Sequence, residues 1–229
     1  MTTVTAGAAA SSWPQGVVRL FGGVAFSLGL VLVVVGGAEL FTGNNLLTMA
    51  WASRRITTLA LARNWALVFL GNTLGAFSMA GLIVLSGQPK LLSGAVGAQA
   101  IAIAKLKMHE SFVEAFVLGV LCNVLVCLAV WMAFSARTTV DRVVAVVPPI
   151  AAFVTTGFEH NVANLYLLPV ALLAAREPVV LQAAALDAVP EWLTIGRMAM
   201  NLLPVTLGNM VGGGLLVGAT YWTIYLRRT

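Results

Sequence analysis

Long apolar runs separated by short charged segments dominate this chain. Leu20–Ala38 has nineteen residues without a charge and Ala115–Ala136 has 22. A helix needs about 20 predominantly apolar residues to cross a bilayer. The sequence therefore predicts a single transmembrane domain over 1–229 with a tail over 1–16. The expected crossings are 18–53, 64–88, 110–135, 143–174 and 199–226.

Two of the predicted crossings are interrupted by polar residues near their middle. In the second of them, sixteen uncharged residues (143–158) lead up to Glu159 and His160, and fifteen (161–175) follow. An ionisable residue at the centre of a membrane helix costs about 3 kcal/mol on insertion scales, so such residues usually face protein or water. We therefore expect a broken helix that lines a cavity. A helix kink whose polar groups are satisfied by neighbours is the alternative.

Composition supports an integral membrane protein. Only 9% of the residues are charged, 60% are hydrophobic, and the mean hydropathy is +0.96. Soluble domains carry about 25% charged residues. The net charge of +5 comes from basic residues at segment ends, where they orient the chain and meet anionic lipid. We expect the lipid bilayer, and no nucleic acid, as a partner.

The sequence contains no motif that points to an enzyme or a metal site. Cys122 and Cys127 lie five residues apart in one apolar run, where a helix points them in different directions. We interpret them as packing residues. CxxC, HExxH, P-loop and GxSxG patterns do not occur in the sequence. We therefore expect no metal, no cofactor and no enzymatic activity.

The two interrupted crossings belong to an internal repeat. Gly36–Glu39 corresponds to Thr156–Glu159, 120 residues later, and the motif Leu-Gly-Asn-x-x-Gly follows each break, at 70–75 and 207–212. Three crossings from one copy to the next imply opposite orientations in the membrane. Paired broken helices in an inverted repeat are typical of a transport site at the midplane. A complete arrangement has six crossings, so we expect the first helix to be missing from this chain.

The motifs of the repeat resemble those of the formate/nitrite transporter family, and most of all those of its formate channels. Gly157–Asn164 (Gly-Phe-Glu-His-Asn-Val-Ala-Asn) is similar to the central-histidine motif of that family. Gly36–Thr42, Lys107–His109, Leu118–Trp131 and Leu203–Gly214 resemble its other motifs in the same order. The resemblance covers nearly the whole chain.

This resemblance implies an aquaporin-like, all-α fold, a homopentamer with one pore in each protomer, and small monovalent anions as cargo. It also implies functional residues by position. The pathway residues would be His160 as the central histidine, Thr42 facing it, Lys107 beneath a vestibule and Asn123 as the polar companion of that lysine. One apolar constriction would consist of Leu30, Leu40 and Phe41, and the other of Phe26, Val126 and Phe153.

Each proposed role has a simpler structural alternative. Lys107 could reach toward the membrane interface without binding cargo, Thr42 could cap a half-helix, and Asn123 could join helices. For Glu39, Glu159 and Asn161 we favour support of the loop. The chemistry centres on His160, because histidine titrates near neutral pH and could pass a proton to a weak-acid anion at an apolar slit.

The most favoured function is therefore the passage of formate, linked to protons through His160. Nitrite or hydrosulfide passage is the alternative within the family. An intramembrane enzyme using Glu159 and His160 and a non-conducting remnant are the other hypotheses. The distribution of arginines predicts a multi-pass protein of the inner (plasma) membrane with its C-terminus in the cytoplasm.

Overall fold

The structure, a computed structural model, describes residues 13–227, and every element in that range is a helix. Residues 1–12 of the predicted tail lie outside the described part. In chain order the elements are α2 (Gln15–Phe26), α3 (Leu28–Gly36), η1 (Gly43–Leu46), α4 (Leu47–Ala52), α5 (Thr58–Leu85), η2 (Gln88–Lys90), α6 (Ala95–Met108), α7 (Phe112–Phe134), α8 (Thr139–Thr156), α9 (Asn161–Ala174), α10 (Pro178–Ala183), α11 (Ile195–Met210), and the π-helical η3 (Val211–Ala219) and η4 (Trp222–Leu226).

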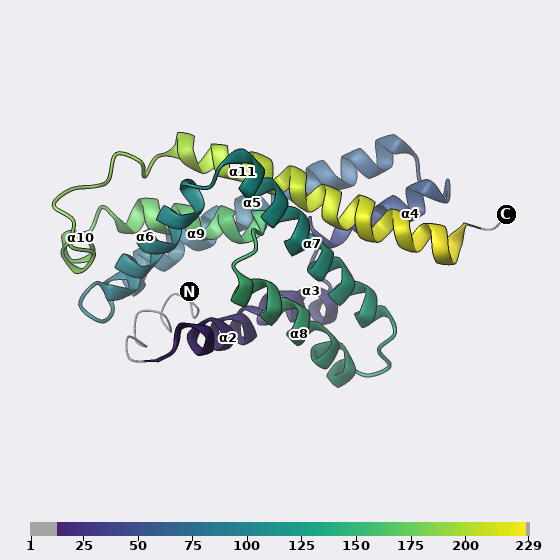
Figure 1. Ribbon diagram of the computed structural model, residues 1–229, viewed down its shortest axis with the longest axis horizontal. Coiled ribbons are helices and arrows are strands. Elements are labelled where there is room, and N and C mark those ends of the chain that lie inside the picture. Colours follow the sequence, from purple (N-terminus) through teal and green to yellow (C-terminus); the bar gives the residue numbers. More distant parts are fainter. Residues whose placement is uncertain (1–12, 228–229) are drawn as a thin grey trace.

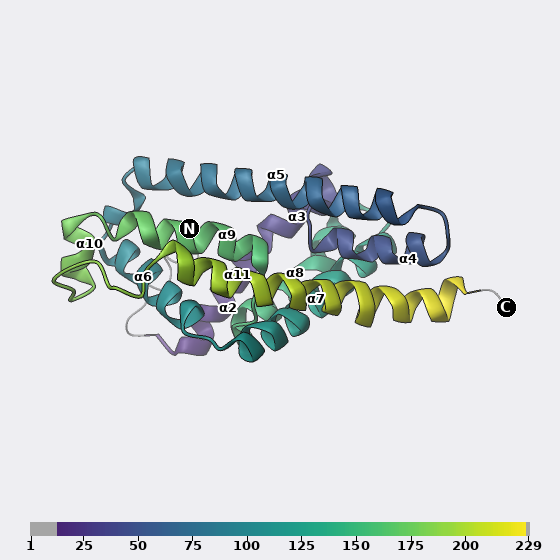
Figure 2. The same cartoon turned by 90° about the horizontal axis from the view of Figure 1, so that it is seen from above.

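Within the described residues, five helical segments are long and apolar enough to cross a membrane. They are Gln15–Gly36, Thr58–Leu85, Phe112–Phe134, Thr139–Thr156 and Ile195–Leu226. The prediction of an all-α membrane fold is confirmed. Figure 2 shows α5 and the long helix of α11, η3 and η4 extending along the length of the molecule.

Three helices begin four to six residues before the start of the predicted crossings. They are α5, α8 and α11, whose uncharged runs begin near 64, 143 and 199. In each case a threonine just ahead of the helix accepts a backbone hydrogen bond and caps it: Thr57, Thr138 and Thr194. Charged residues are tolerated in the first two turns of these helices, so a count of uncharged residues alone places the start too late.

Both interruptions break a helix at a glycine in the left-handed region. Gly37 ends α3 with φ 76° and ψ 24°, and Gly157 ends α8 with φ 77° and ψ 26°. Side chains with a Cβ rarely adopt this conformation, whereas glycine does so without strain. After each break the chain runs a few residues without helix and then enters a second half-helix, which is η1 and α4 in the first copy and α9 in the second.

One asparagine holds the connecting backbone at each break, and the two bond in the same way. Asn72 on α5 accepts from Phe41 N at 2.9 Å and donates to Glu39 O at 3.0 Å. Asn209 on α11 accepts from Asn161 N at 3.0 Å and donates to Glu159 O at 3.0 Å. These asparagines are the Asn of the two Leu-Gly-Asn motifs. The motif recurs because a broken membrane helix exposes backbone groups that must be hydrogen-bonded inside the protein.

The buried apolar residues form two clusters, one at each end of the second broken helix. The first cluster joins α6, α9 and α10 with part of α5, and the second joins α3, α7, α8 and η3. α8 packs against α2 and α3, whereas α9 packs against α5 and α6. Figure 1 shows the break between α8 and α9 near the centre of the molecule. Buried polar residues, including Thr42, His160, Asn123 and Asn209, belong to neither cluster.

The packing of α7 against α11 and η3 depends on small residues, Gly208 of α11 and Gly212 of η3. A Cβ at Gly208 would collide with the carbonyl oxygen of Phe116, and one at Gly212 with that of Val120. Both oxygens belong to the backbone of α7 and cannot turn away. Contact between two backbones is the usual reason for glycine at membrane helix interfaces.

We predict that Gly208→Ala lowers the stability of the protein by about 1–3 kcal/mol, because the added methyl group overpacks the α7–α11 contact. The matched control is Gly71→Ala, at the equivalent position of the first repeat, where a Cβ would have nothing within 4 Å. Thermal unfolding of the purified protein in detergent measures both. Equal melting temperatures for the two variants would contradict this account.

Candidate functional site

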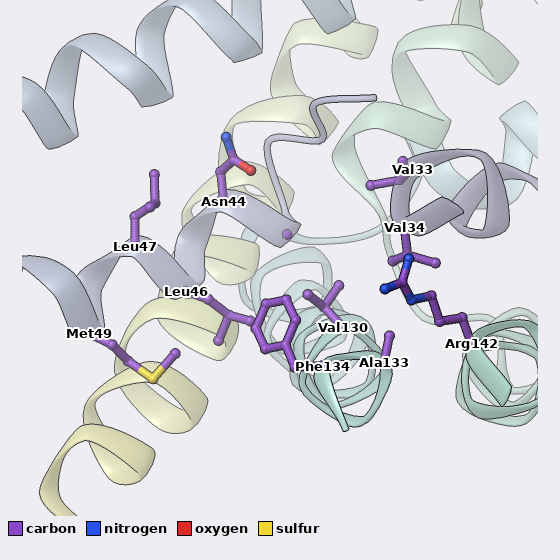
Figure 3. Close-up of a pocket in the computed structure, with 11 residues that line it drawn as sticks. Val33, Val34, Asn44, Leu46, Leu47, Met49, Val130, Ala133, Phe134 and Arg142 are labelled. Atoms are coloured by element: carbon purple, nitrogen blue, oxygen red, sulfur yellow. The ribbon is translucent and has the colours of Figure 1, made fainter. Parts of the chain in front are cut away.

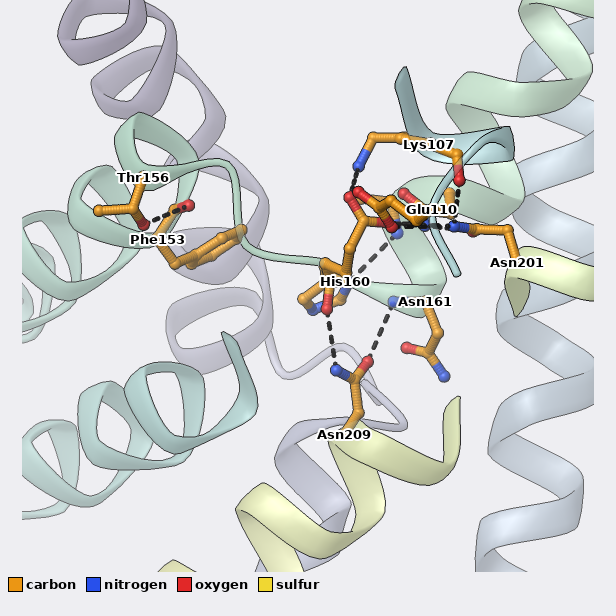
Figure 4. Close-up of polar contacts among 11 residues, drawn as sticks. Lys107, Glu110, Phe153, Thr156, His160, Asn161, Asn201 and Asn209 are labelled. Carbon is orange, nitrogen blue, oxygen red and sulfur yellow. Dashed lines mark hydrogen bonds and ion pairs between the residues drawn. The ribbon is translucent and has the colours of Figure 1, made fainter. Parts of the chain in front are cut away.

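His160 lies where the two broken helices meet, and both ring nitrogens are engaged. Its Nδ1 accepts a hydrogen bond from Ala163 N at 3.2 Å and so caps α9. The neutral ring therefore carries its proton on Nε2, which lies 3.1 Å from Thr42 Oγ1 and donates to it. The Thr42 hydroxyl is left free to donate to a third group. Phe153 stacks on the imidazole with ring centroids 5.8 Å apart (Figure 4).

Thr42 is fully buried, and its carbonyl is held from α7. Asn123 Nδ2 donates to Thr42 O at 3.2 Å, to Asn45 Oδ1 at 3.2 Å and to Asn209 O at 2.6 Å. Asn123 thus ties the first broken helix to α11. The structure places it beside Thr42, and no hydrogen bond joins it to Lys107 among the described residues.

Lys107, in the last turn of α6, forms an ion pair with Glu159. The Lys107 side chain is 14% exposed and that of Glu159 is 1% exposed. Glu159 Oε2 also accepts from Asn164 Nδ2 at 2.6 Å, and Asn164 Nδ2 lies 2.8 Å from Asn201 Oδ1. A buried charge needs both a counter-ion and hydrogen bonds, and this network supplies them.

The first repeat carries the same arrangement of a glutamate and asparagines. Glu39 Oε2 accepts from Asn44 Nδ2 at 2.5 Å, and Asn44 Nδ2 donates to Asn64 Oδ1 at 3.0 Å. The matching bonds in the second repeat join Glu159, Asn164 and Asn201. The side chains of Glu39 and Glu159 therefore accept hydrogen bonds from asparagine side chains. The connecting backbone is bonded instead by Asn72 and Asn209, the asparagines of the two Leu-Gly-Asn motifs.

The two copies differ in charge. Glu39 is exposed, and within the part of the chain that the structure describes no cation pairs with it. Glu159 is buried and paired with Lys107. Asn161, the third residue expected to support the loop, accepts from Val162 N at 2.8 Å through its own side chain.

Of the residues of the expected constrictions, Phe153 contacts the histidine ring, and all the others except Phe41 belong to or pack against the same apolar cluster as Phe153. Phe26 and Phe153 meet edge to face at 5.7 Å between ring centroids, and Val126 and Leu30 are buried in the same cluster. Leu40 packs against that cluster. Phe41 instead contacts Phe69 and Trp65 of α5, with centroids 5.2 and 6.3 Å away.

Two cavities, lined by different helices, lie beside residues of this site. One of about 560 Å³ is lined by Gly43, the neighbour of Thr42, and by apolar residues of α3, α4 and α7. Arg142 is the single ionisable residue in its lining, and Figure 3 shows its side chain directed toward Val34. The other cavity, of about 670 Å³, is lined by Glu110 and Leu118, and the Leu118 carbonyl accepts from Glu159 N at 3.3 Å. The first cavity therefore reaches the neighbour of Thr42, and the second reaches a residue hydrogen-bonded to the neighbour of His160.

Sequence reasoning missed three polar residues of this site, namely Asn164, Asn201 and Glu110. Asn201 Nδ2 donates to Lys107 O at 2.9 Å and lies 3.4 Å from Glu110 Oε2. A signal for the asparagines was present, since Asn64 and Asn72 have the same spacing as Asn201 and Asn209. Among the described residues, no three His, Cys, Asp or Glu side chains converge as a metal site would require.

Comparison with known proteins places the chain among membrane transporters. The family model described as "Formate/nitrite transporter" matches residues 1–223. Over 228 residues the chain is 43% identical to the formate channel FocA of Escherichia coli (strain K12), covering 98% of this chain and 80% of that protein. It is 41% identical to the formate channel FocA of Haemophilus influenzae over 242 residues, covering all of this chain and 80% of that protein.

Solved structures agree with the sequence relatives. One described as a pentameric formate channel with formate bound superposes with a TM-score of 0.90 at 41% identity, covering 98% of this chain and 90% of that one. Another, described as an FNT family ion channel, gives 0.82 at 28% identity, covering 97% and 83%. The family relationship expected from the motifs is confirmed. This chain belongs to the formate/nitrite transporter family and has the fold of its channels.

Proposed function

We propose that this chain carries formate across the inner membrane through a pore of its own within a homopentamer. The observation that carries the proposal is the buried, hydrogen-bonded His160–Thr42 pair at the meeting point of the two broken helices. The names of the FocA relatives and of the pentameric neighbour support formate as cargo and five copies as the assembly. A cytoplasmic C-terminus, multi-pass insertion and a single domain over 1–229 remain part of the proposal.

An anion that leaves water for the apolar passage must find polar partners. Phe153, which stacks on the histidine, belongs to an apolar cluster in which Val126 and Leu30 are also buried. Hydrocarbon solvates a carboxylate poorly. The Thr42 hydroxyl, which accepts from His160 and is free to donate, supplies a hydrogen bond at this point. The N-terminus of α9 adds partial positive charge, because His160 is its capping residue.

Proton linkage requires a change at His160 Nδ1. In the structure this nitrogen accepts from Ala163 N, so a proton can bind there only after the ring releases the helix cap. The protonated ring then gives that proton to a carboxylate oxygen of formate, and neutral formic acid crosses the slit beside Phe153. The ring returns to its neutral form and caps α9 again.

The first test is formate uptake into proteoliposomes from pH 5 to pH 8. We expect uptake by the unmodified protein to rise as the pH falls, and His160→Ala to lose about tenfold or more of it, because the variant lacks the group that transfers the proton. His109→Ala is the matched control, because His109 is the other histidine of the chain and packs on Trp192. An unchanged pH profile in His160→Ala would contradict the proton link, and parallel assays with nitrite and hydrosulfide test the alternative cargo.

A second test separates a structural role of Lys107 from attraction of cargo. Lys107→Gln leaves the buried Glu159 carboxylate without its counter-ion, and we expect a loss of about 3–5 kcal/mol of stability. The double variant Lys107→Gln/Glu159→Gln removes both charges and should recover most of that stability. Thermal unfolding measures this part. If the folded double variant also transports formate normally, Lys107 acts only through its ion pair.

A further inference from the structure

We infer that Glu110 determines how readily monovalent anions reach the Lys107 side of the pathway, because its carboxylate repels them when ionised and admits them when protonated. This inference rests on the proposed function. It concerns a residue at a different position from the histidine and the constrictions, in the connection between α6 and α7.

Glu110 belongs to the polar network through Asn201. Its Oε2 lies 3.4 Å from Asn201 Nδ2, and the same nitrogen donates to Lys107 O and lies 3.5 Å from Glu159 Oε2. The side chain is half-buried and also lines the cavity of about 670 Å³. Figure 4 shows Glu110 beside Lys107 at the edge of this network. Glu110 therefore stands between the cavity and the buried ion pair.

The charges of this cluster do not attract an anion as Lys107 alone would. Lys107 and Glu159 form an ion pair, so their charges cancel locally. Within residues 13–227 Glu110 has no cation partner at ion-pair distance. The three side chains together therefore carry one negative charge when Glu110 is ionised and none when it is protonated.

The other ionisable groups around Glu110 do not change this count. Glu114 on α7 is exposed, and its carboxylate accepts from Ser111 N at 2.8 Å to cap that helix. His109 Nδ1 lies 2.6 Å from Lys105 O, and its ring contacts Trp192. Lys105 is exposed and lines the same cavity. These groups surround the cavity, whereas Glu110 alone among them bonds into the network.

Glu110 changes its charge within the physiological range. Burial, and next the negative charge of Glu159, raise the pKa of Glu110 from 4.5 to about 7, while Lys107 acts in the opposite direction. A carboxyl group with this pKa is mostly protonated at pH 6 and mostly ionised at pH 8. The cavity on the Arg142 side has no acidic residue in its lining, so its charge does not follow pH in this way.

The expected effect is several-fold. A unit charge about 8 Å from a monovalent anion, at an effective dielectric constant of about 20 and screened by physiological salt, alters anion occupancy by about three- to tenfold. Proton-coupled transport depends on pH as well. The informative quantity is therefore the ratio of KM values for two variants at one pH, from which that shared dependence cancels.

The experiment compares the KM for formate of the unmodified chain and of Glu110→Gln in proteoliposomes at pH 6 and pH 8. Glutamine keeps an oxygen that can accept from Asn201 but carries no charge. We expect Glu110→Gln to lower KM about three- to tenfold at pH 8 and to leave it unchanged at pH 6. The matched control is Glu114→Gln, which lines the same cavity and keeps a residue suited to the capping box. Its KM should follow that of the unmodified chain at both pH values.

Three outcomes would overturn the inference. One is an equal KM for Glu110→Gln and the unmodified chain at pH 8, and another is the same decrease for Glu114→Gln. The third, which needs only the unmodified chain, is a KM at pH 8 that does not fall when an impermeant salt raises the ionic strength and screens the charge. A failure of the proposed function is distinguishable, because the unmodified chain would then carry no formate at any pH.

Discussion

The need to satisfy backbone groups at two breaks within the membrane governs this structure. A helix interrupted in the apolar layer exposes N–H and C=O groups that water cannot reach. Asn72 and Asn209 each form two hydrogen bonds with the connecting segment. Each accepts from one backbone N–H and donates to one backbone C=O, at equivalent positions in the two copies. Other buried polar residues bond to the same region: Asn123 donates to the backbone of Asn209, and Thr42 bonds His160.

The second constraint is the cost of buried charge. Glu159 is almost fully enclosed, and the protein surrounds it with Lys107, Asn164 and the connection to Asn201. Its counterpart Glu39 keeps the asparagine bonds but is exposed. The two copies of the repeat therefore share the same hydrogen bonds but differ in the burial and charge pairing of their glutamate. The two cavities also differ in charge, because Arg142 is the single ionisable residue lining one, whereas Lys105, His109, Glu110 and Glu114 line the other.

Local rules explain the parts of the chain that sequence reasoning described well. Apolar runs of membrane length, polar residues near the middle of two of them, and two copies of Leu-Gly-Asn predicted the helices, the breaks and the repeat. Each of these features acts over a few residues. Helix ends were less well predicted, since Thr57, Thr138 and Thr194 extend their helices beyond the uncharged runs.

The sequence by itself therefore determined the fold class, the two broken helices and the position of His160 at the second break, because the length of an apolar run and the polar residues that interrupt it are properties of adjacent residues. Only the tertiary structure decided what each polar side chain bonds. It paired Lys107 with Glu159 across 52 positions, set Asn123 against Thr42 across 81, and brought Glu110 to Asn201 across 91. These partners come from helices that meet only after packing, so spacing along the chain can mark a polar residue but does not identify the residue that it bonds.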